Sequence, residues 1–295
     1  MDNSQAIIEA HNLYRVFHSK KAVSDVSFCV QRGEIFGLLG PNGAGKTTTI
    51  RMLTGQLDPS SGSATVAGCD TVKQRQRLKE RIGVVFEDQN LYERLSAQQN
   101  LAFSCWLYGL PKSRIDEVLT LVQLRDRAKD RISTFSNGMR QRIMIARALL
   151  HRPPVLFLDE PSRGLDPVSA QEVRKTIQRL SQEGTTILLT THLMEEADQL
   201  CQRVAFLVDG KIVANDTPRN LKLSHGQRTM TVTLNEAGAL TERTIKLDDL
   251  HDQATLAHWM SQGLVRAAHT NEATLEEVFI EVAFPFRILK RIEQG

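Results

Sequence analysis

The sequence predicts an α/β fold built on a parallel sheet, and three features of the chain support this prediction. A glycine-rich segment, residues 40–45, joins an apolar run at 35–39 that fits a buried strand to a segment that can continue as a helix. Two further apolar runs, at 155–158 and 186–190, are separated by a segment at 167–182 with apolar residues at helical spacing. Strands that alternate with helices indicate a parallel sheet, with ligands at the carboxyl edge of its strands.

Composition predicts a cytosolic protein with one large domain and a smaller one. The chain has 295 residues, of which 24% are charged and 41% hydrophobic, and its net charge of +3 is too small to argue for a nucleic-acid partner. No apolar stretch reaches the length of a membrane span, and residues 1–5 do not resemble a secretory signal. The four cysteines fit no metal spacing, so we expect buried thiols in a reducing compartment.

The remaining elements follow in chain order. Residues 6–38 have the pattern of short strands, at 6–10 and 23–28, with a turn at 31–34. Strands are also expected at 63–66 and 82–86, and residues 96–150 have a helical pattern. Beyond 222 the predicted elements are strands at 229–234, 243–247 and 264–268 with a helix at 253–262, which form a small α+β module.

The glycine-rich segment carries the most specific signal. Residues 40–47 match the phosphate-binding template G-x-x-x-x-G-K-[ST] without a mismatch, between a predicted strand and a helix. Backbone N–H groups of such a loop close around a phosphate at the helix N-terminus, so a nucleoside triphosphate is the expected ligand. An ordinary glycine-rich turn would not need to match every fixed position. The expected nucleotide contacts are Gly40, Pro41, Asn42, Gly43, Ala44, Gly45, Lys46, Thr47 and Thr48.

Two carboxylates, Asp159 and Glu160, end the apolar run at 155–158. An acidic residue at such a strand end holds Mg²⁺ in phosphate-loop enzymes, and a second can polarise the attacking water. Two solvated acids at a strand end are the alternative interpretation of this pair alone. Behind a phosphate loop, the pair instead predicts hydrolysis of the nucleotide.

Three further segments resemble the ATP-binding-cassette (ABC) ATPases, over roughly residues 6–220. These segments are 135–142, which opens a helix after Ser136, then 161–167, and finally Thr190-Thr191-His192 at a strand end. The resemblance implies an ABC-type P-loop ATPase with a parallel α/β core sheet, an antiparallel β-subdomain and a helical subdomain at about 88–150. It also implies ATP and Mg²⁺ as cofactors, and a head-to-tail homodimer with two ATP molecules at the interface.

The resemblance further implies roles for single residues. Within one subunit, Phe17 would stack on adenine, Glu160 would be the catalytic base, and His192 would sense the γ-phosphate. Thr47 and Asp159 would lie on the Mg²⁺ side. Across the dimer, Ser136 and Gly138 would meet the γ-phosphate of the partner subunit, and Asp166 belongs to a loop that crosses the interface.

The chain departs from the family pattern at three positions. Glu87 stands where the family usually has a glutamine that faces Mg²⁺, and Gln89 follows two residues later, so either could serve the metal side. Asn137 replaces the commoner glycine, and asparagine is the residue that next best tolerates a positive φ. Met139 replaces a glutamine. The last two changes resemble exporter-type ATPases of the ABC-2 class.

We therefore expect an ATP-hydrolysing subunit of an ABC-2-type exporter, with a nucleotide-binding domain at 1–221 and an accessory module at 222–295. It would energise a separate membrane permease, bound near residues 87–94, from the cytoplasmic face of the inner membrane. Import instead of export also stays open, because the sequence shows no permease or binding protein. An ABC ATPase that acts on ribosomes or DNA is the alternative from another class, although this chain has neither a second cassette nor a long coiled-coil insertion. The basic, apolar tail at 284–292 could pack internally or fray, or contact a membrane or a partner subunit.

Overall fold

The structure is a computed structural model that describes residues 6–87, 90–226, 229–236, 239–271 and 273–283. It divides into two compact units, Met1–Asn215 and Asp216–Gly295, so the division falls six residues before the predicted boundary (221 − 215). Gln89 and the tail at 284–295 lie outside the described residues.

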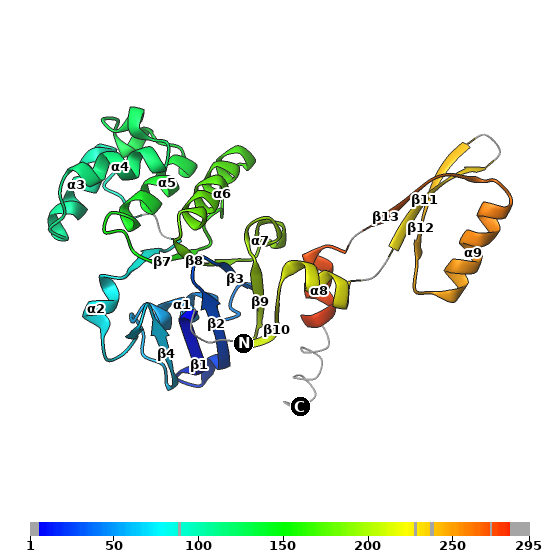
Figure 1. The fold of residues 1–295 in the computed structure, drawn as a ribbon, viewed down its shortest axis with the longest axis horizontal. Helices are drawn as coiled ribbons and strands as arrows, with labels where there is room; N and C mark the ends of the chain where they lie inside the picture. The colour runs from blue at the N-terminus through cyan, green and yellow to red at the C-terminus, as the bar shows by residue number, and fades with distance from the viewer. Residues whose placement is uncertain (1–5, 88–89, 227–228, 237–238, 272, 284–295) are drawn as a thin grey trace. The chain divides into compact units, whose positions relative to one another are not determined.

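The first unit begins with an antiparallel sheet of four strands in the order β2-β1-β4-β5 (Figure 1). Its strands are β1 (Ala6–Phe17), β2 (Lys20–Gln31), β4 (Ser61–Val66) and β5 (Cys69–Asp70). The short strands predicted at 6–10 and 23–28 are parts of one long hairpin with 12 residues in each arm. Alternation of buried and exposed residues continues past the apolar runs, because one face of this sheet packs on the core.

The second sheet has six strands in the order β10-β9-β3-β8-β7-β6, and the strands from β9 to β6 are parallel neighbours. These strands are β3 (Ile35–Leu39), β6 (Ile82–Val85), β7 (Val155–Asp159), β8 (Thr186–Thr191), β9 (Arg203–Val208) and β10 (Lys211–Asp216). Every residue of β3, β7 and β8 is buried, which explains why these strands are mostly apolar, with polar residues at the ends of β7 and β8. The predicted parallel sheet is confirmed.

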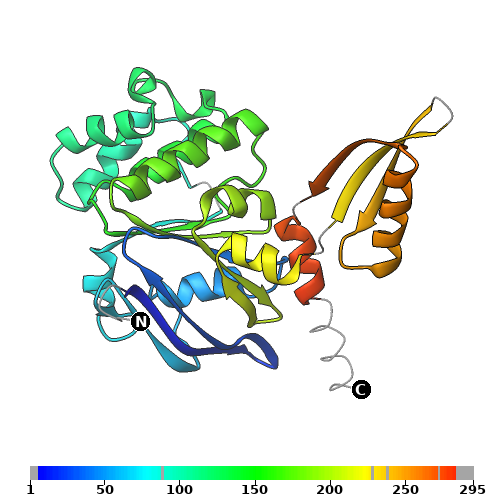
Figure 2. The same ribbon diagram turned by 45° about the vertical axis from the view of Figure 1, so that its right-hand side comes forward.

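Helices cover both faces of this sheet (Figures 1 and 2). Helix α1 (Lys46–Leu53) packs against β1, β2 and β4 on one side and β7 on the other, so it fills the space between the two sheets. Helices α6 (Pro167–Gln182) and α7 (Met194–Leu200) pack on the opposite face, against β8 and, for α7, also β3. The result is a layered core with the loop after β3 at its carboxyl edge.

The predicted helical segment at 96–150 forms a subdomain of three helices, α3 (Ala97–Leu107), α4 (Ser113–Leu121) and α5 (Asn137–Ala148). Two single 3₁₀ turns, Arg125–Arg127 and Ile132–Thr134, separate α4 from α5. Ser96 and Ser136 begin α3 and α5, and each hydroxyl accepts a hydrogen bond from a backbone N–H in the first turn. A short helix, α2 (Arg75–Lys79), precedes β6.

The second unit holds α8 (Pro218–His225) and a three-stranded antiparallel sheet in the order β12-β11-β13. Its strands are β11 (Thr229–Glu236), β12 (Ala239–Lys246) and β13 (Val265–Asn271). Helix α9 (Leu250–Ser261) covers one face, where Leu256 and Trp259 pack on Val232, Leu234 and Ile245. Residues 275–283 form a further helix. This is the small α+β module expected from the sequence.

Candidate nucleotide-binding site

Four neighbouring strands of the parallel sheet each deliver one functional segment to its carboxyl edge. The phosphate loop follows β3, Glu160 follows β7, His192 follows β8, and Glu87 comes two residues after β6. Because these strands are adjacent and parallel, segments far apart in the sequence meet at one edge.

The phosphate loop depends on glycine where it meets α1. Gly45, the N-cap of α1, has a φ of 109°, and a Cβ there would lie 2.4 Å from the backbone oxygen of Ala22. Lys46 begins the helix and is 6% exposed, and its Nζ donates to the backbone oxygen of Gly40 at 2.7 Å. The loop therefore folds around the ammonium group at a helix N-terminus, which is a suitable site for an anion.

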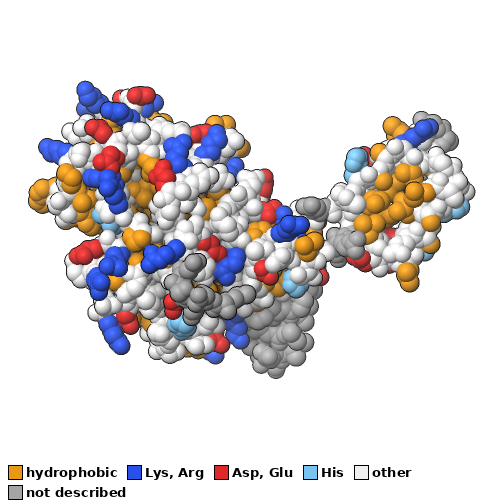
Figure 3. All heavy atoms as spheres, viewed as in Figure 1, with side chains coloured by type: hydrophobic (Ala, Val, Ile, Leu, Met, Phe, Trp, Pro, Cys, Tyr) orange, Lys and Arg blue, Asp and Glu red, His pale blue; other side chains and the backbone are white. Residues whose placement is uncertain are grey.

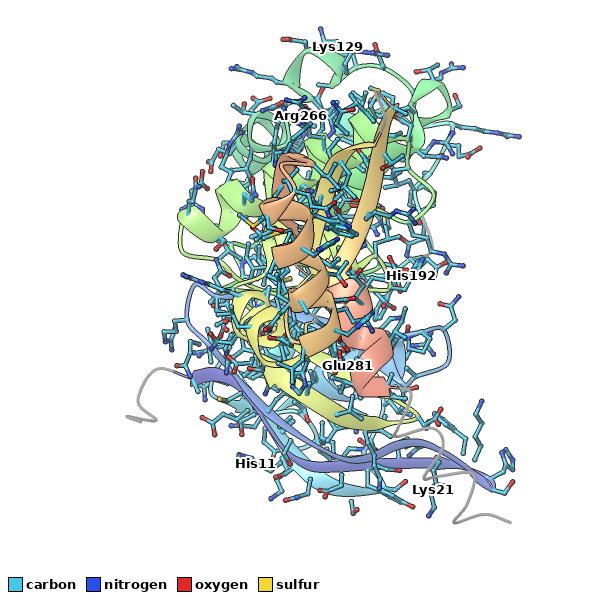
Figure 4. All side chains as sticks on the ribbon, turned by 90° about the vertical axis from the view of Figure 1, so that its right-hand side faces the viewer. His11, Lys21, Lys129, His192, Arg266 and Glu281 are labelled. Carbon is cyan, nitrogen blue, oxygen red and sulfur yellow. The ribbon has the colours of Figure 1, made fainter. Side chains whose placement is uncertain are left out.

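Glu160 links the phosphate loop to His192. Its Oε1 lies 3.0 Å from Lys46 Nζ, and its Oε2 lies 2.7 Å from Nδ1 of His192, a residue labelled in Figure 4. The Glu160 side chain is 6% exposed, whereas that of His192 is 36% exposed. The carboxylate is thus held between two groups that can donate hydrogen bonds, with the imidazole on the solvent side.

The backbone of Glu160 is held in an unusual conformation. Its φ is 53°, in the left-handed region that side chains other than glycine seldom adopt. Its N–H donates to the backbone oxygen of Thr190 at 3.0 Å, and Thr190 Oγ1 donates to Oδ1 of buried Asp159 at 2.5 Å. Strand β8 therefore fixes the backbone of Glu160 and the carboxylate of Asp159, and the conformation of Glu160 points to a functional constraint.

A pocket of about 270 Å³ is lined by Lys46, Glu160 and the phosphate loop. Phe17, at the end of β1, lies at this pocket, and the Arg15 guanidinium is 4.7 Å from the centre of its ring. The aromatic ring, glycine loop and cations fit the base and phosphates of a nucleotide. The lining residues are Phe17, Lys20, Ala22, Pro41, Asn42, Gly43, Gly45, Lys46, Thr47, Thr48, Glu87, Glu160 and Arg163.

The donor set also fits Mg²⁺ carried by a nucleotide. Within the described parts of the chain, no three His, Cys, Asp or Glu side chains gather into a metal cluster. Mg²⁺ is usually bound by one or two carboxylates together with phosphate oxygens and water, rather than by an all-protein cage. Thr47 lines the pocket and Asp159 ends β7 directly before Glu160, and these two side chains would provide oxygen ligands of this kind.

The residues expected to act across a dimer form a separate group. Gly138 is buried and packs so closely on α6 that a Cβ there would lie 2.4 Å from Cβ of Ser169. The N–H of Ser169 donates to Asp166 Oδ1 at 2.9 Å, and hydrogen bonding from Ser169 lowers the pKa of Asp166. Ser136, Gly138 and Asp166 therefore lie around the contact between α5 and α6, and none of them lines the pocket.

Asn137 does not have a positive φ in the structure. It is the first residue of α5, in helical conformation, so its tolerance of left-handed backbone is not used. The N-cap itself, Ser136, has an extended backbone with φ −64° and ψ 162°.

Glu87 forms an ion pair with Arg163, a residue that the sequence argument did not single out. Arg163 lies in the loop at 161–167, where the resemblance drew attention to Asp166 instead. Glu196 in α7 is a further carboxyl that the sequence did not predict at this site; it is buried, and burial raises its pKa above 4.5. Its position four residues after His192, in a helix that packs on β8, is the only signal the sequence offers.

Comparisons with known proteins place this site in a family context. A family model described as ABC transporter matches residues 23–163. The chain is 42% identical over 265 residues to a fluoroquinolones export ATP-binding protein of Mycobacterium tuberculosis H37Rv, covering 90% of this chain and 88% of the relative. It is 37% identical to a linearmycin resistance ATP-binding protein of Bacillus subtilis, covering 94% and 84%. A bacitracin transport ATP-binding protein of Bacillus licheniformis is 36% identical, with 93% and 90% covered.

Solved structures show the same fold. An ATP-binding subunit of an ABC transporter superposes with a TM-score of 0.66 at 29% identity, covering 75% of this chain and 93% of that chain. A part of an ABC transporter complex from Clostridium perfringens superposes with a TM-score of 0.70 at 28% identity, covering 75% of this chain and 92% of that chain.

No helix among the described residues has the length and apolar character to cross a membrane.

Proposed function

This chain belongs to the ABC transporter family as an ATP-binding and ATP-hydrolysing subunit, and we propose that it works as a head-to-tail homodimer that energises a separate export permease. The supporting observation is the Lys46–Glu160–His192 chain at the phosphate end of the pocket. Relatives named for export or resistance support this proposal over action on ribosomes or DNA.

In this proposal each residue of the chain acts at a defined atom. Lys46 Nζ moves from Glu160 to the β- and γ-phosphates, because phosphate oxygens carry more negative charge than the carboxylate it leaves. Glu160 then accepts a proton from the attacking water, while His192 Nδ1 orients its carboxylate. Mg²⁺, held by Thr47 and Asp159, would neutralise charge on the phosphate oxygens. Phe17 stacks on the base.

The dimer completes the site in this proposal. Ser136, Gly138 and Asp166 lie outside the pocket of their own subunit, at the junction of α5 and α6. The N-terminus of α5 carries partial positive charge, which suits the γ-phosphate of the partner subunit.

An exposed aromatic cluster on the helical subdomain supports a permease contact. Tyr92, Phe103 and Trp106 are 55%, 44% and 77% exposed. The ring centre of Phe103 lies 5.6 Å from that of Tyr92 and 6.2 Å from that of Trp106. Figure 3 shows hydrophobic side chains on the outer side of α3. The cluster begins five residues after Glu87 (92 − 87), so a permease seated there would contact the segment that leads from the nucleotide site. The subunit would then be peripheral on the cytoplasmic face of the inner membrane.

An ATPase assay, copurification from membranes and a gene deletion together test the proposal. The purified subunit should hydrolyse ATP only with Mg²⁺, and the protein that copurifies from membranes should be a multispanning permease. Deleting the gene should sensitise cells to antibiotics of the kinds for which the relatives are named, and the wild type but not Glu160→Gln should restore resistance. Copurification with ribosomes, or full resistance with Glu160→Gln, would contradict the export function.

A further inference from the structure

The nucleotide pocket contains a second ion pair, between Glu87 and Arg163, in addition to the one between Lys46 and Glu160. Glu87 comes after β6 and Arg163 comes after β7, so the pair joins two neighbouring strand ends 76 residues apart in sequence. Both side chains line the pocket together with Lys46 and Glu160.

The two pairs differ in burial. The side chains of Lys46 and Glu160 are both 6% exposed, whereas those of Arg163 and Glu87 are 43% and 49% exposed. An exposed pair between long side chains shifts an equilibrium by about fivefold at most. Arg163 can therefore leave Glu87 at little cost, and it remains next to the space that the phosphates would occupy.

The charges in the pocket give Arg163 a partner once nucleotide arrives. The charged residues that line it are Lys20, Lys46, Glu87, Glu160 and Arg163. A guanidinium presents a planar fork of donors that matches phosphate oxygens, and such charge-assisted bonds are about twice as strong as neutral ones. Glu87, once released, offers carboxylate oxygens of the type that a hard divalent cation prefers.

We propose that Arg163 is a phosphate-sensing residue of this site, which exchanges Glu87 for the terminal phosphate of a bound triphosphate. The exchange frees Glu87 toward the metal and releases the contact between the loops after β6 and β7. A diphosphate lacks the terminal group, so Arg163 stays on Glu87. This inference rests on the nucleotide site proposed above and adds a residue that separates ATP from ADP.

Calorimetry with purified protein tests the exchange by measuring the affinities for ATP and ADP. Arg163→Gln should weaken ATP binding by about tenfold or more, the usual worth of a hydrogen bond to a charged group, and change ADP affinity by less than about threefold. Arg163→Lys should recover part of the loss, since it keeps the charge without the fork. Arg75→Gln is the matched control, because Arg75 and its partner Asp58 are 42% and 55% exposed and neither lines the pocket.

In the absence of Mg²⁺, Glu87→Gln should change ATP affinity in the opposite direction. Removing the competing carboxylate should strengthen ATP binding in EDTA by up to about fivefold. Equal losses of ATP and ADP affinity in Arg163→Gln, or weaker ATP binding by Glu87→Gln in EDTA, would overturn the exchange. If wild type bound neither nucleotide, the nucleotide site itself would be wrong, so the two failures are distinguishable.

Discussion

Lys46 Nζ lies 3.0 Å from Glu160 Oε1, and this contact joins the phosphate loop to the end of β7. Both side chains are almost fully buried, so each charge depends on the other for compensation. The group that would bind phosphate and the group that would activate water are therefore already partners. In the mechanism proposed above, a nucleotide that draws away the lysine would leave Glu160 paired with His192 alone.

Lys46→Ala should abolish tight ATP binding, with a loss of at least about a hundredfold, because it removes several charge-assisted bonds at once. Calorimetry with purified protein measures the loss. Lys175→Ala is the control, since Lys175 pairs with Glu172 on the exposed side of α6. Affinity near that of wild type in Lys46→Ala would refute the role of this loop.

Glu160→Gln should bind ATP but turn over at least about a hundredfold more slowly, which is the usual worth of a general base. It should also accumulate as an ATP-dependent dimer on gel filtration, because closure is no longer followed by hydrolysis. Glu195→Gln, at an exposed position in α7, should behave like wild type. A fully active, monomeric Glu160→Gln would argue against the assignment.

The sequence predicts the parallel sheet and the phosphate loop because both depend on local patterns. A buried strand is a continuous apolar run, and Gly45 is required by its own φ and by the backbone of Ala22. The left-handed φ of Glu160 is not visible in the sequence, because contacts with β8 hold it. The Arg163–Glu87 pair is equally hidden, since its members meet only when β6 and β7 are adjacent.

Ser136→Arg should allow ATP to bind but prevent hydrolysis, because a bulky side chain would occupy the position of the partner's γ-phosphate. The change also removes the N-cap of α5, which costs about 1 kcal/mol of stability. Ser96→Arg is the matched control, because Ser96 caps α3 in the same way at a different place.

Mixing Ser136→Arg subunits with Lys46→Ala subunits sharpens this test. A mixed dimer contains one site with an intact loop and an intact opposing serine, so part of the ATPase activity should return. Activity in the mixture no higher than in either variant alone would contradict the head-to-tail arrangement.

Glu87→Gln should leave maximal hydrolysis within roughly tenfold of wild type but raise the Mg²⁺ concentration for half-maximal activity, because a neutral amide oxygen replaces a carboxylate ligand. A magnesium titration of the ATPase rate measures the shift. Glu93→Gln is the control, since Glu93 pairs with Arg140 and does not line the pocket. An unchanged Mg²⁺ requirement would place Glu87 outside the metal site.

The last prediction concerns Glu196, a buried carboxyl in α7 that is 2% exposed. Burial is the largest influence on this carboxyl and raises its pKa above 4.5. The hydroxyls of Ser162 and Thr191 and the charge of Arg174 oppose that rise, whereas the charge of Glu160 adds to it. The folded protein therefore holds the Glu196 proton more strongly than the unfolded chain does.

The sign of the pH dependence follows from this difference. The stabilising contribution of protonated Glu196 is complete below pH 4.5 and is lost as pH rises through the raised pKa of the folded state. Glu196→Gln cannot titrate, so its melting temperature relative to wild type should increase as pH rises across that window. Glu117→Gln is a control of opposite sign, because the hydrogen bond from Arg152 lowers the pKa of Glu117. A melting-temperature difference between wild type and Glu196→Gln that stays constant with pH would show that folding does not raise the pKa of Glu196.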